Sequence, residues 1–240
     1  MSTIHKYHLS SYVLEQAQEE DLEQLLFICR SNIGIVDEEQ ITKAFTLCYL
    51  SHDGITRASG EPYYYHPVEV AKIVAQEINI DDTSVIAALL HDTVEDTDIS
   101  LEDIRYWFGE EVAVIIDGVT KITGVFKTRD SKQAETFMKL LLSMAEDIRV
   151  ILIKFADRLH NMRTIQHLRR EKQIQIASET MDLYAPLAHR FGLFSIKNEL
   201  EDLGVILKDK SSEIDLHDIA KEESKMLENE LVSLNKKLEL

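Results

Sequence analysis

Turn-forming residues are scarce in this sequence, which has only eight glycines and three prolines among 240 residues. Because glycine and proline mark most breaks between elements, so few of them favour long helices over many short strands. At this length the chain can bury a substantial core. The sequence therefore predicts an all-α protein, a bundle of roughly ten helices.

Cysteine and long apolar runs are also scarce. Cys29 and Cys48 are the only cysteines, and both fall in helical, partly apolar patterns, which favours two reduced core thiols over a disulfide. The N-terminus lacks the apolar run of a signal peptide, and no stretch approaches the ~20 apolar residues of a membrane span. We therefore expect a cytoplasmic protein that does not bind membranes.

Positive charge is in short supply, with 26 basic against 43 acidic side chains and a formal net charge of -17. A general nucleic-acid binder needs clustered lysine and arginine to neutralise phosphates, so this class is excluded. A small anionic ligand remains possible, because a bound cation can override the net field locally.

Apolar residues at helical spacing predict helices over most of the chain, with breaks at Gly34, at 54–65, at Gly109 and at a flexible 121–130 segment that could be a lid or a plain surface loop. The nearly continuous apolar run 85–90 predicts a buried, central helix. Further helices are expected over 131–145, 148–165, 171–189 with a kink or restart at Pro186, and 196–203. The acidic stretch 216–240 carries leucines at helical spacing and could dock on its own domain or on another copy of the chain.

Four polar residues, far apart in sequence, emerge from these apolar helices. His66 precedes a proline at a helix start, His91 and Asp92 close the apolar run, and Asp157 follows another apolar stretch. Burying an unpaired carboxylate is costly, and a metal would satisfy imidazole and carboxylate together. The sequence predicts that these four side chains bind a divalent metal in a phosphohydrolase site.

Two acidic residues follow the His-Asp pair. If the helix continues, Glu95 lies under His91 and Asp96 lies under Asp92, one turn further along. This spacing predicts a second layer of carboxylates beside the metal ligands. Taken alone, the same run is also typical of a helix that ends in a solvated acidic turn.

Around Asp157, one helix face carries Lys154, Asn161 and Thr164 at spacings of three and four. An apolar helix with such a polar strip is poorly explained as core alone. Arg158, His160 and Arg163 lie on neighbouring faces, where they could bind phosphate or pair with surface acids. His52 is expected to be a half-buried structural residue.

The loop before His66 offers further donors. Arg57 and Ser59 lie between helix-breaking residues, so the loop could direct them at a phosphate or a base, although a solvated loop would look the same.

These clusters resemble the HD-domain metal phosphohydrolases and, more closely, the hydrolase domain of the RelA/SpoT homologue family, which cleaves the alarmones ppGpp and pppGpp. The resemblance runs from about residue 52 to residue 203. The similar motifs follow one another as RASGEPY (57–63), HP (66–67), ALLHDTVED (88–96), FGEEV (108–112), DGVTK (117–121), QAE (133–135), DIRVILIK (147–154), ADRLHNMRT (156–164) and YAPLAHR (184–190).

The resemblance implies one manganese ion bound by His66, His91, Asp92 and Asp157, with Glu95 and Asp96 orienting the attacking water. It implies that Arg57, Ser59, Asn161 and Thr164 contact the nucleotide. We include Lys154 among the substrate-binding residues because it shares a helix face with Asn161 and Thr164. The implied reaction removes pyrophosphate from the ribose 3′ position and leaves GDP or GTP, ending the stringent response.

The chain departs from the family pattern at three places. Ala58 replaces a common lysine and Met138 a common arginine, which weakens the expected nucleotide pocket. No synthetase motif follows residue 203, so we expect an HD hydrolase domain over 1–203 and a helical tail over 204–240, either as a hydrolase-only member or as a hydrolase half.

Other functions stay open on the sequence alone. One is an HD-type hydrolase of another nucleotide, such as the 2′-phosphate of NADPH or a deoxynucleotide. Another is a non-catalytic alarmone-binding module, and the leucines of the tail would suit a homo-oligomer. The complete set of ligand residues favours an enzyme.

Overall fold

The computed structural model describes residue 9, residues 12–126 and residues 147–207. The predicted helix over 131–145, Met138 and the tail over 216–240 therefore lie outside the described residues. Within the described ranges the fold is all-α, as predicted, and the only β-type pairing is an isolated bridge between Thr56 and Pro62.

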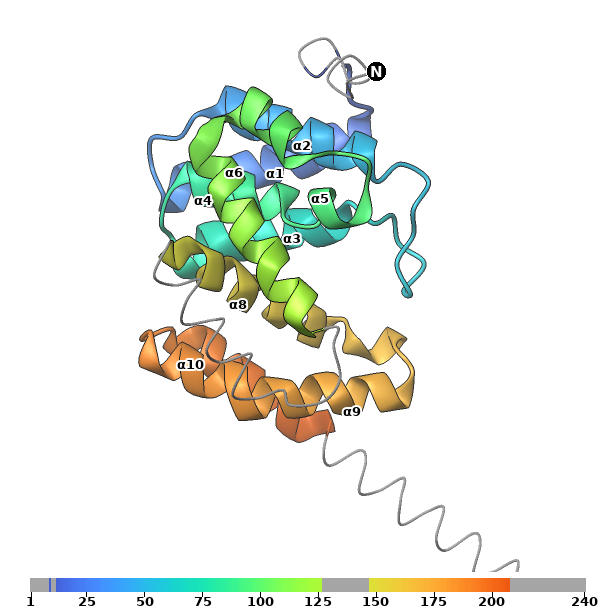
Figure 1. The fold of residues 1–240 in the computed structure, drawn as a ribbon, viewed down its shortest axis with the longest axis vertical. Helices are drawn as coiled ribbons and strands as arrows, with labels where there is room; N and C mark the ends of the chain where they lie inside the picture. The colour runs from blue at the N-terminus through green and yellow to red at the C-terminus, as the bar shows by residue number, and fades with distance from the viewer. Residues whose placement is uncertain (1–8, 10–11, 127–146, 208–240) are drawn as a thin grey trace, which may run out of the picture.

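Helices follow one another through both described ranges, joined by short turns except at the longer loop over 52–64 (Figure 1). In chain order they are α1 (Gln16–Asn32), α2 (Glu38–Ser51), α3 (Tyr65–Ile73), the π-helical turn η3 (Val74–Ile78), α4 (Asp82–Leu90), α5 (Thr93–Asp96), α6 (Leu101–Phe126), α8 (Ile148–Arg163), the 3-10 turn η4 (Ile165–His167), α9 (Arg170–Glu179), the π-helical turn η5 (Thr180–Tyr184), α10 (Ala185–Arg190) and a last helix over 194–207.

Helix α4 is the centre of the fold and packs against α2, α3 and α6. Its residues 84–90 are all buried, as the apolar run predicted. Burying each large aliphatic side chain contributes about 1.5–3 kcal/mol, so this helix is held firmly in place. Cys29 and Cys48 belong to the same core as free thiols. Burial raises the pKa of Cys29 to about 11, so the thiol stays protonated, in agreement with the prediction of reduced cysteines.

The chain does not continue as one helix through the acidic run, which corrects that expectation. Helix α4 ends at Leu90, and α5 begins at Thr93 after a turn formed by His91 and Asp92. The His91 ring lies 2.8 Å from the Ala88 carbonyl oxygen through Nδ1, and thus competes for an acceptor that the next helical turn would use. Glu95 therefore does not stack one turn under His91 in a continuous helix.

Helix α6 shows one break that was predicted and one extension that was not. Gly109 interrupts it with φ 89° and ψ 172°, a conformation reserved for glycine. Beyond that point α6 runs to Phe126, through residues expected to begin a flexible loop at Lys121. The Lys121 ammonium pairs with Asp117 one turn earlier, at 2.6 Å between Nζ and Oδ2, which supports the helix at this point.

The C-terminal helices form a separate layer beneath α8 in Figure 1, where α9, η5 and α10 follow one another end to end. At the predicted kink or restart near Pro186 the helical run is unbroken and only its type changes: the π-helical turn η5 ends at Tyr184, and α10 starts immediately before the proline. The last helix runs across residue 203 to residue 207. In the part of the chain that the structure describes, no helix is both long and apolar enough to span a bilayer.

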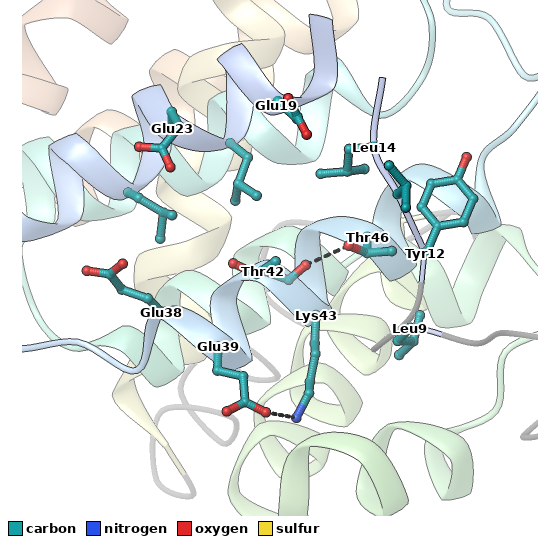
Figure 2. Close-up of a pocket in the computed structure, with 13 residues that line it drawn as sticks. Leu9, Tyr12, Leu14, Glu19, Glu23, Glu38, Glu39, Thr42, Lys43 and Thr46 are labelled. Carbon is teal, nitrogen blue, oxygen red and sulfur yellow. Dashed lines mark hydrogen bonds and ion pairs between the residues drawn. The ribbon is translucent and has the colours of Figure 1, made fainter. Parts of the chain in front are cut away.

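A hollow lies between α1, α2 and the segment before α1 (Figure 2). Four carboxylates line it, those of Glu19, Glu23, Glu38 and Glu39, and Lys43 is paired with Glu39 at 2.7 Å. Because acidic side chains dominate its polar lining, this hollow is unsuited to a phosphate-bearing ligand. None of the predicted site residues lines it.

Asp81 caps α4, and its loss is expected to destabilise the fold. Its Oδ1 accepts hydrogen bonds from the Ser84 backbone N at 2.7 Å and from Ser84 Oγ at 2.6 Å, while Oδ2 pairs with Arg149 at 3.1 Å. Asp81→Ala should lower the free energy of unfolding by about 1–2 kcal/mol in urea titrations. Asp81→Asn keeps the cap and should lose less. Equal losses would assign the stabilisation to the ion pair with Arg149.

Candidate metal centre

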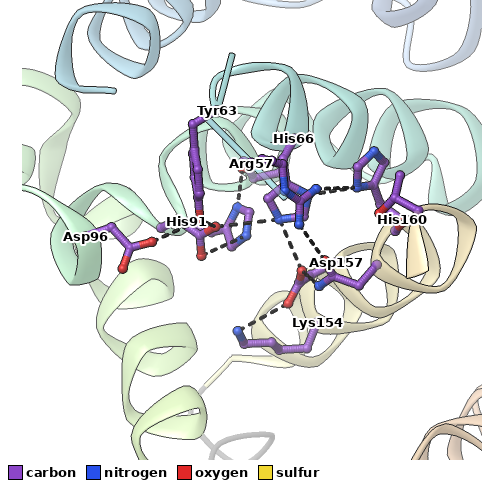
Figure 3. A network of polar contacts seen from close by, with 12 residues as sticks. Arg57, Tyr63, His66, His91, Asp96, Lys154, Asp157 and His160 are labelled. Carbon is purple, nitrogen blue, oxygen red and sulfur yellow. Dashed lines mark hydrogen bonds and ion pairs between the residues drawn. The ribbon is translucent and has the colours of Figure 1, made fainter. Parts of the chain in front are cut away.

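Three elements bring the predicted metal ligands together. His66 lies in the first turn of α3, His91 and Asp92 form the turn between α4 and α5, and Asp157 lies midway along α8. Helix α3 packs against both α4 and α8, so ligands that are distant in sequence converge on one point. Figure 3 shows His66 between His91 on one side and Asp157 on the other.

Three of the four predicted ligands lie within reach of one ion, and the fourth, Asp157, lies beside His66. His66 Nε2 is 3.3 Å from Asp157 Oδ1 and 3.6 Å from Asp92 Oδ2. His91 Nε2 is 3.1 Å from Asp92 Oδ1. One ligand atom each from His66, His91 and Asp92 lies within 4.8 Å of the others, which suits a single ion. The structure thus brings together all four residues predicted as ligands.

The tautomer of His91 shows that the cluster fits a cation. The Nδ1 of His91 lies 2.8 Å from the Ala88 carbonyl oxygen, so Nδ1 carries the hydrogen and donates it. In the neutral ring Nε2 then carries the lone pair, and within the described residues no hydrogen-bond partner satisfies this buried atom. It faces a carboxylate oxygen of Asp92, also an acceptor, at 3.1 Å. Two acceptors at this distance repel unless a proton or a metal cation is shared between them, and two imidazoles with two carboxylates suit a borderline divalent ion.

The electrostatics of the cluster favour positive charge at the same point. Burial alone would lower the pKa of His91, but the charge and hydrogen bond of Asp92 and the charge of Asp157 outweigh burial and raise it. Burial would raise the pKa of Asp92, and His91 and His66 instead hold it well below its usual range. The field that stabilises a proton on His91 also attracts a divalent cation.

Lys154 supports the cluster from within the core. Its side chain is 5% exposed, and Nζ lies 3.5 Å from Asp157 Oδ2. Burial would lower the pKa of Lys154, but the charges of Asp157 and Asp92 outweigh it and raise the pKa. The ammonium in turn lowers the pKa of Asp157 against the effect of burial. The structure places Lys154 beside the predicted ligand Asp157, and not among the residues that line the neighbouring pocket.

The other predicted substrate contacts share a pocket next to the cluster. Arg57 and Ser59 come from the loop before α3, and Asn161 and Thr164 come from the end of α8. All four line one small pocket, together with Ala58, His167 and Leu168. The loop is held by backbone hydrogen bonds from Arg57 N to Glu61 O and from Tyr63 N to Ile55 O, both 2.9 Å, so its donors are well placed.

The two acidic residues of α5 lie at the edge of the cluster. Asp96 Oδ2 and Asp92 Oδ2 each lie 2.9 Å from the Tyr63 hydroxyl, which bridges the two carboxylates. Glu95 precedes Asp96 in the same short helix and is partly buried. Figure 3 shows Tyr63 and Asp96 on the His91 side of the network.

Two residues of the network were not among the predicted site residues. Tyr63 orients Asp92 and Asp96, and it stacks on His52, with ring centroids 4.8 Å apart. His52 is buried and bonds to the Cys48 carbonyl through Nδ1, which agrees with its expected structural role.

His160 is the other addition, with its Nδ1 2.8 Å from His66 Nδ1. Burial, with the nearby His66 and Arg57, lowers the pKa of His160 to about 3, so its ring is neutral. The sequence signals available for these two residues were their positions, three before His66 and three after Asp157.

Known proteins are similar to this chain over a large part of its length. A family model described as an HD domain matches residues 44–194. A guanosine-3′,5′-bis(diphosphate) 3′-pyrophosphohydrolase of Haemophilus influenzae is 54% identical over 154 residues, which is 64% of this chain and 23% of that protein. The protein of the same name from Aquifex aeolicus is 50% identical over 188 residues, or 78% of this chain and 26% of its own length.

A GTP pyrophosphokinase of Myxococcus xanthus is 50% identical over 171 residues, or 70% of this chain and 22% of that protein. The chain thus spans about a quarter of the length of the curated relatives it matches. The similarity covers the region that contains every residue of the metal centre.

Proposed function

Because this chain belongs to the HD domain family, we propose that it is a manganese-dependent hydrolase of the alarmones ppGpp and pppGpp. It removes the 3′-diphosphate as pyrophosphate and leaves GDP or GTP. The observation that carries the proposal is the cluster of His66, His91, Asp92 and Asp157, whose acceptor atoms converge beside a pocket lined by Arg57. The names of the relatives from Haemophilus influenzae and Aquifex aeolicus support the substrate.

The four ligand side chains have the donor set for the metal. A divalent ion bound there would lower the pKa of water and offset the negative charge on the reacting phosphate. Lys154 keeps Asp157 ionised, and the bond from His91 Nδ1 to the Ala88 carbonyl keeps its Nε2 available. Manganese is proposed because mixed imidazole and carboxylate ligands suit such an ion.

The remaining residues divide between binding and proton transfer. Arg57, Ser59, Asn161 and Thr164 bind the nucleotide in their shared pocket, where the arginine can form two parallel hydrogen bonds to a phosphate. Glu95 and Asp96 orient the attacking water and accept its proton. The water oxygen forms a bond to the phosphorus that is attached to the ribose, the bond to the 3′ oxygen breaks, and that oxygen takes up a proton.

The direct test measures products from ppGpp. The chain is stripped of metal with a chelator, dialysed, and incubated with ppGpp with and without manganese. Phosphorus NMR should show pyrophosphate and GDP in equal amounts, only when the metal is present. Release of orthophosphate, or no release with manganese, cobalt, zinc or magnesium, would contradict the proposal.

A nucleotide panel separates this function from its alternatives. We expect kcat/KM for ppGpp to exceed that for NADPH and for deoxynucleoside triphosphates. A higher kcat/KM for either competitor would assign the same metal chemistry to another substrate. Tight ppGpp binding without turnover, metal present, would instead indicate an alarmone-binding module.

A further inference from the structure

We propose that His160 is a positioning residue that holds the metal ligand His66 in the tautomer able to bind a cation, and that Arg57 of the nucleotide loop determines this tautomer. The inference rests on the metal site of the proposed function. It adds a residue outside the ligand set and a physical connection between the nucleotide pocket and the metal centre.

The first step concerns His160 and Arg57. Nη1 of the Arg57 guanidinium lies 3.2 Å from His160 Nδ1. Arginine has only donors and no acceptor, so His160 Nδ1 must be the acceptor in this contact. Its hydrogen is therefore absent, and the ring presents a lone pair at Nδ1.

The second step concerns His66. Its Nδ1 lies 2.8 Å from the same His160 Nδ1. Because His160 Nδ1 is an acceptor, His66 Nδ1 must carry the hydrogen and donate it. The lone pair of His66 is then at Nε2, the atom that faces Asp157 at 3.3 Å and Asp92 at 3.6 Å. The hydrogen bond of His66 to His160 thus has the same effect as that of His91 to the Ala88 carbonyl.

A parallel branch starts from the same guanidinium. Nη2 of Arg57 donates to Asn161 Oδ1 at 2.8 Å, and Asn161 Nδ2 donates to Asp157 Oδ1 at 2.6 Å. Arg57 therefore fixes the amide orientation of Asn161 as well as the tautomer of His160. His160 accepts from His66 and Asn161 donates to Asp157, so the two terminal nitrogens of one arginine align two predicted metal ligands.

Because His66 is buried, its hydrogen bond to His160 is difficult to replace. His66 is only 2% exposed, so water cannot readily substitute for His160 if that side chain is lost. His160 and Arg57 are partly buried, with the arginine lining the predicted nucleotide pocket. His160 connects Arg57 to His66. The binding of a ligand to Arg57 and the binding of a cation to His66 Nε2 should therefore be coupled.

The test uses three substitutions at His160 in the full chain, with metal alone as the probe. Asparagine can place its amide oxygen near the position of Nδ1, glutamine reaches instead toward the position of Nε2, and leucine offers neither. Titration calorimetry of the metal-depleted proteins with manganese should show the Kd weakened about 10–100-fold for His160→Leu. His160→Asn should return to within about threefold of the unmodified chain, and His160→Gln should resemble the leucine variant.

Matched controls separate positioning from folding. Arg57→Leu should also weaken manganese binding, whereas Arg163→Leu should not, because Arg163 pairs with Glu199 on the surface, at 2.6 Å between Nε and Oε1. Circular dichroism and melting curves without metal identify any variant that fails to fold. If the leucine variant does not fold, the contrast between asparagine and glutamine still tests the role of Nδ1.

Nitrogen NMR of histidine provides a readout independent of metal affinity. In the metal-free chain, His66 should carry its hydrogen on Nδ1, and His160→Leu should shift it toward a mixture of tautomers. Equal manganese affinity in all folded His160 variants, or a hydrogen on His66 Nε2 in the unmodified chain, would overturn the inference. Failure of the unmodified chain to bind any divalent metal would instead overturn the proposed metal site, while the tautomer of His66 would still test His160.

Discussion

Replacing Asp157 by alanine is expected to abolish the release of pyrophosphate from ppGpp, with a loss of about a thousandfold or more in kcat/KM. Asp157 provides a ligand atom 3.3 Å from His66 Nε2, and its negative charge is matched by Lys154. A metal ion supplies several kcal/mol of stabilisation to the transition state of phosphate hydrolysis. At about 1.4 kcal/mol for each factor of ten, losing the ion corresponds to a loss of this size.

The design must separate the loss of metal from the loss of fold, because Asp157→Ala leaves a buried ammonium without this counter-charge. Asp157→Asn preserves shape and can still accept the hydrogen bond from Asn161, so it should fold while binding manganese poorly. Asp202→Ala changes an exposed aspartate on the last helix and should leave activity unchanged. Metal content measured on each purified protein, beside the hydrolysis rate, checks the prediction. A folded Asp157→Asn protein with full metal content and full activity would refute the assignment of Asp157 as a ligand.

The second large effect is expected at the acidic helix α5. Glu95→Gln and Asp96→Asn should each lower kcat by about 10²–10⁴-fold, because each removes a carboxylate proposed to orient water and accept its proton. Manganese affinity should change little, since neither residue is among the four ligands. The expected signature is a fall in kcat at nearly constant KM and constant metal Kd, which distinguishes these variants from those at Asp157.

Steady-state kinetics at saturating manganese, with calorimetry on the same preparations, makes the comparison. Comparing the two variants separates an indirect effect on the metal from a direct role in proton transfer, because the Tyr63 hydroxyl connects Asp96 to the predicted ligand Asp92. If Asp96→Asn loses metal and Glu95→Gln does not, Asp96 acts through Asp92 and Glu95 is the proton acceptor. Full kcat in both variants would exclude α5 from the chemistry.

Local pattern was enough for much of the molecule. The apolar run 85–90 predicted the buried helix α4, and the His66-Pro67 pair predicted the start of α3. These predictions held because burial periodicity and proline geometry act over one or two turns and need no partner from elsewhere. Local pattern gave the wrong position for the ends of two helices. Helix α4 ends before the turn of His91 and Asp92, and α6 extends to Phe126.

The four predicted metal ligands, far apart in sequence, lie side by side in the structure. The sequence by itself determined which side chains could bind a divalent ion, because imidazole and carboxylate groups that emerge from apolar helices have few other uses. The tertiary structure decided which nitrogen of each histidine is available, through the Ala88 carbonyl for His91 and through His160 and Arg57 for His66.

The tertiary structure also decided that Lys154 pairs with Asp157 inside the core and that the Tyr63 hydroxyl contacts the carboxylates of Asp92 and Asp96. Hydrogen positions depend on partners that only the packing of α3 against α4 and α8 brings within about 3 Å. No spacing along a single helix contains that information.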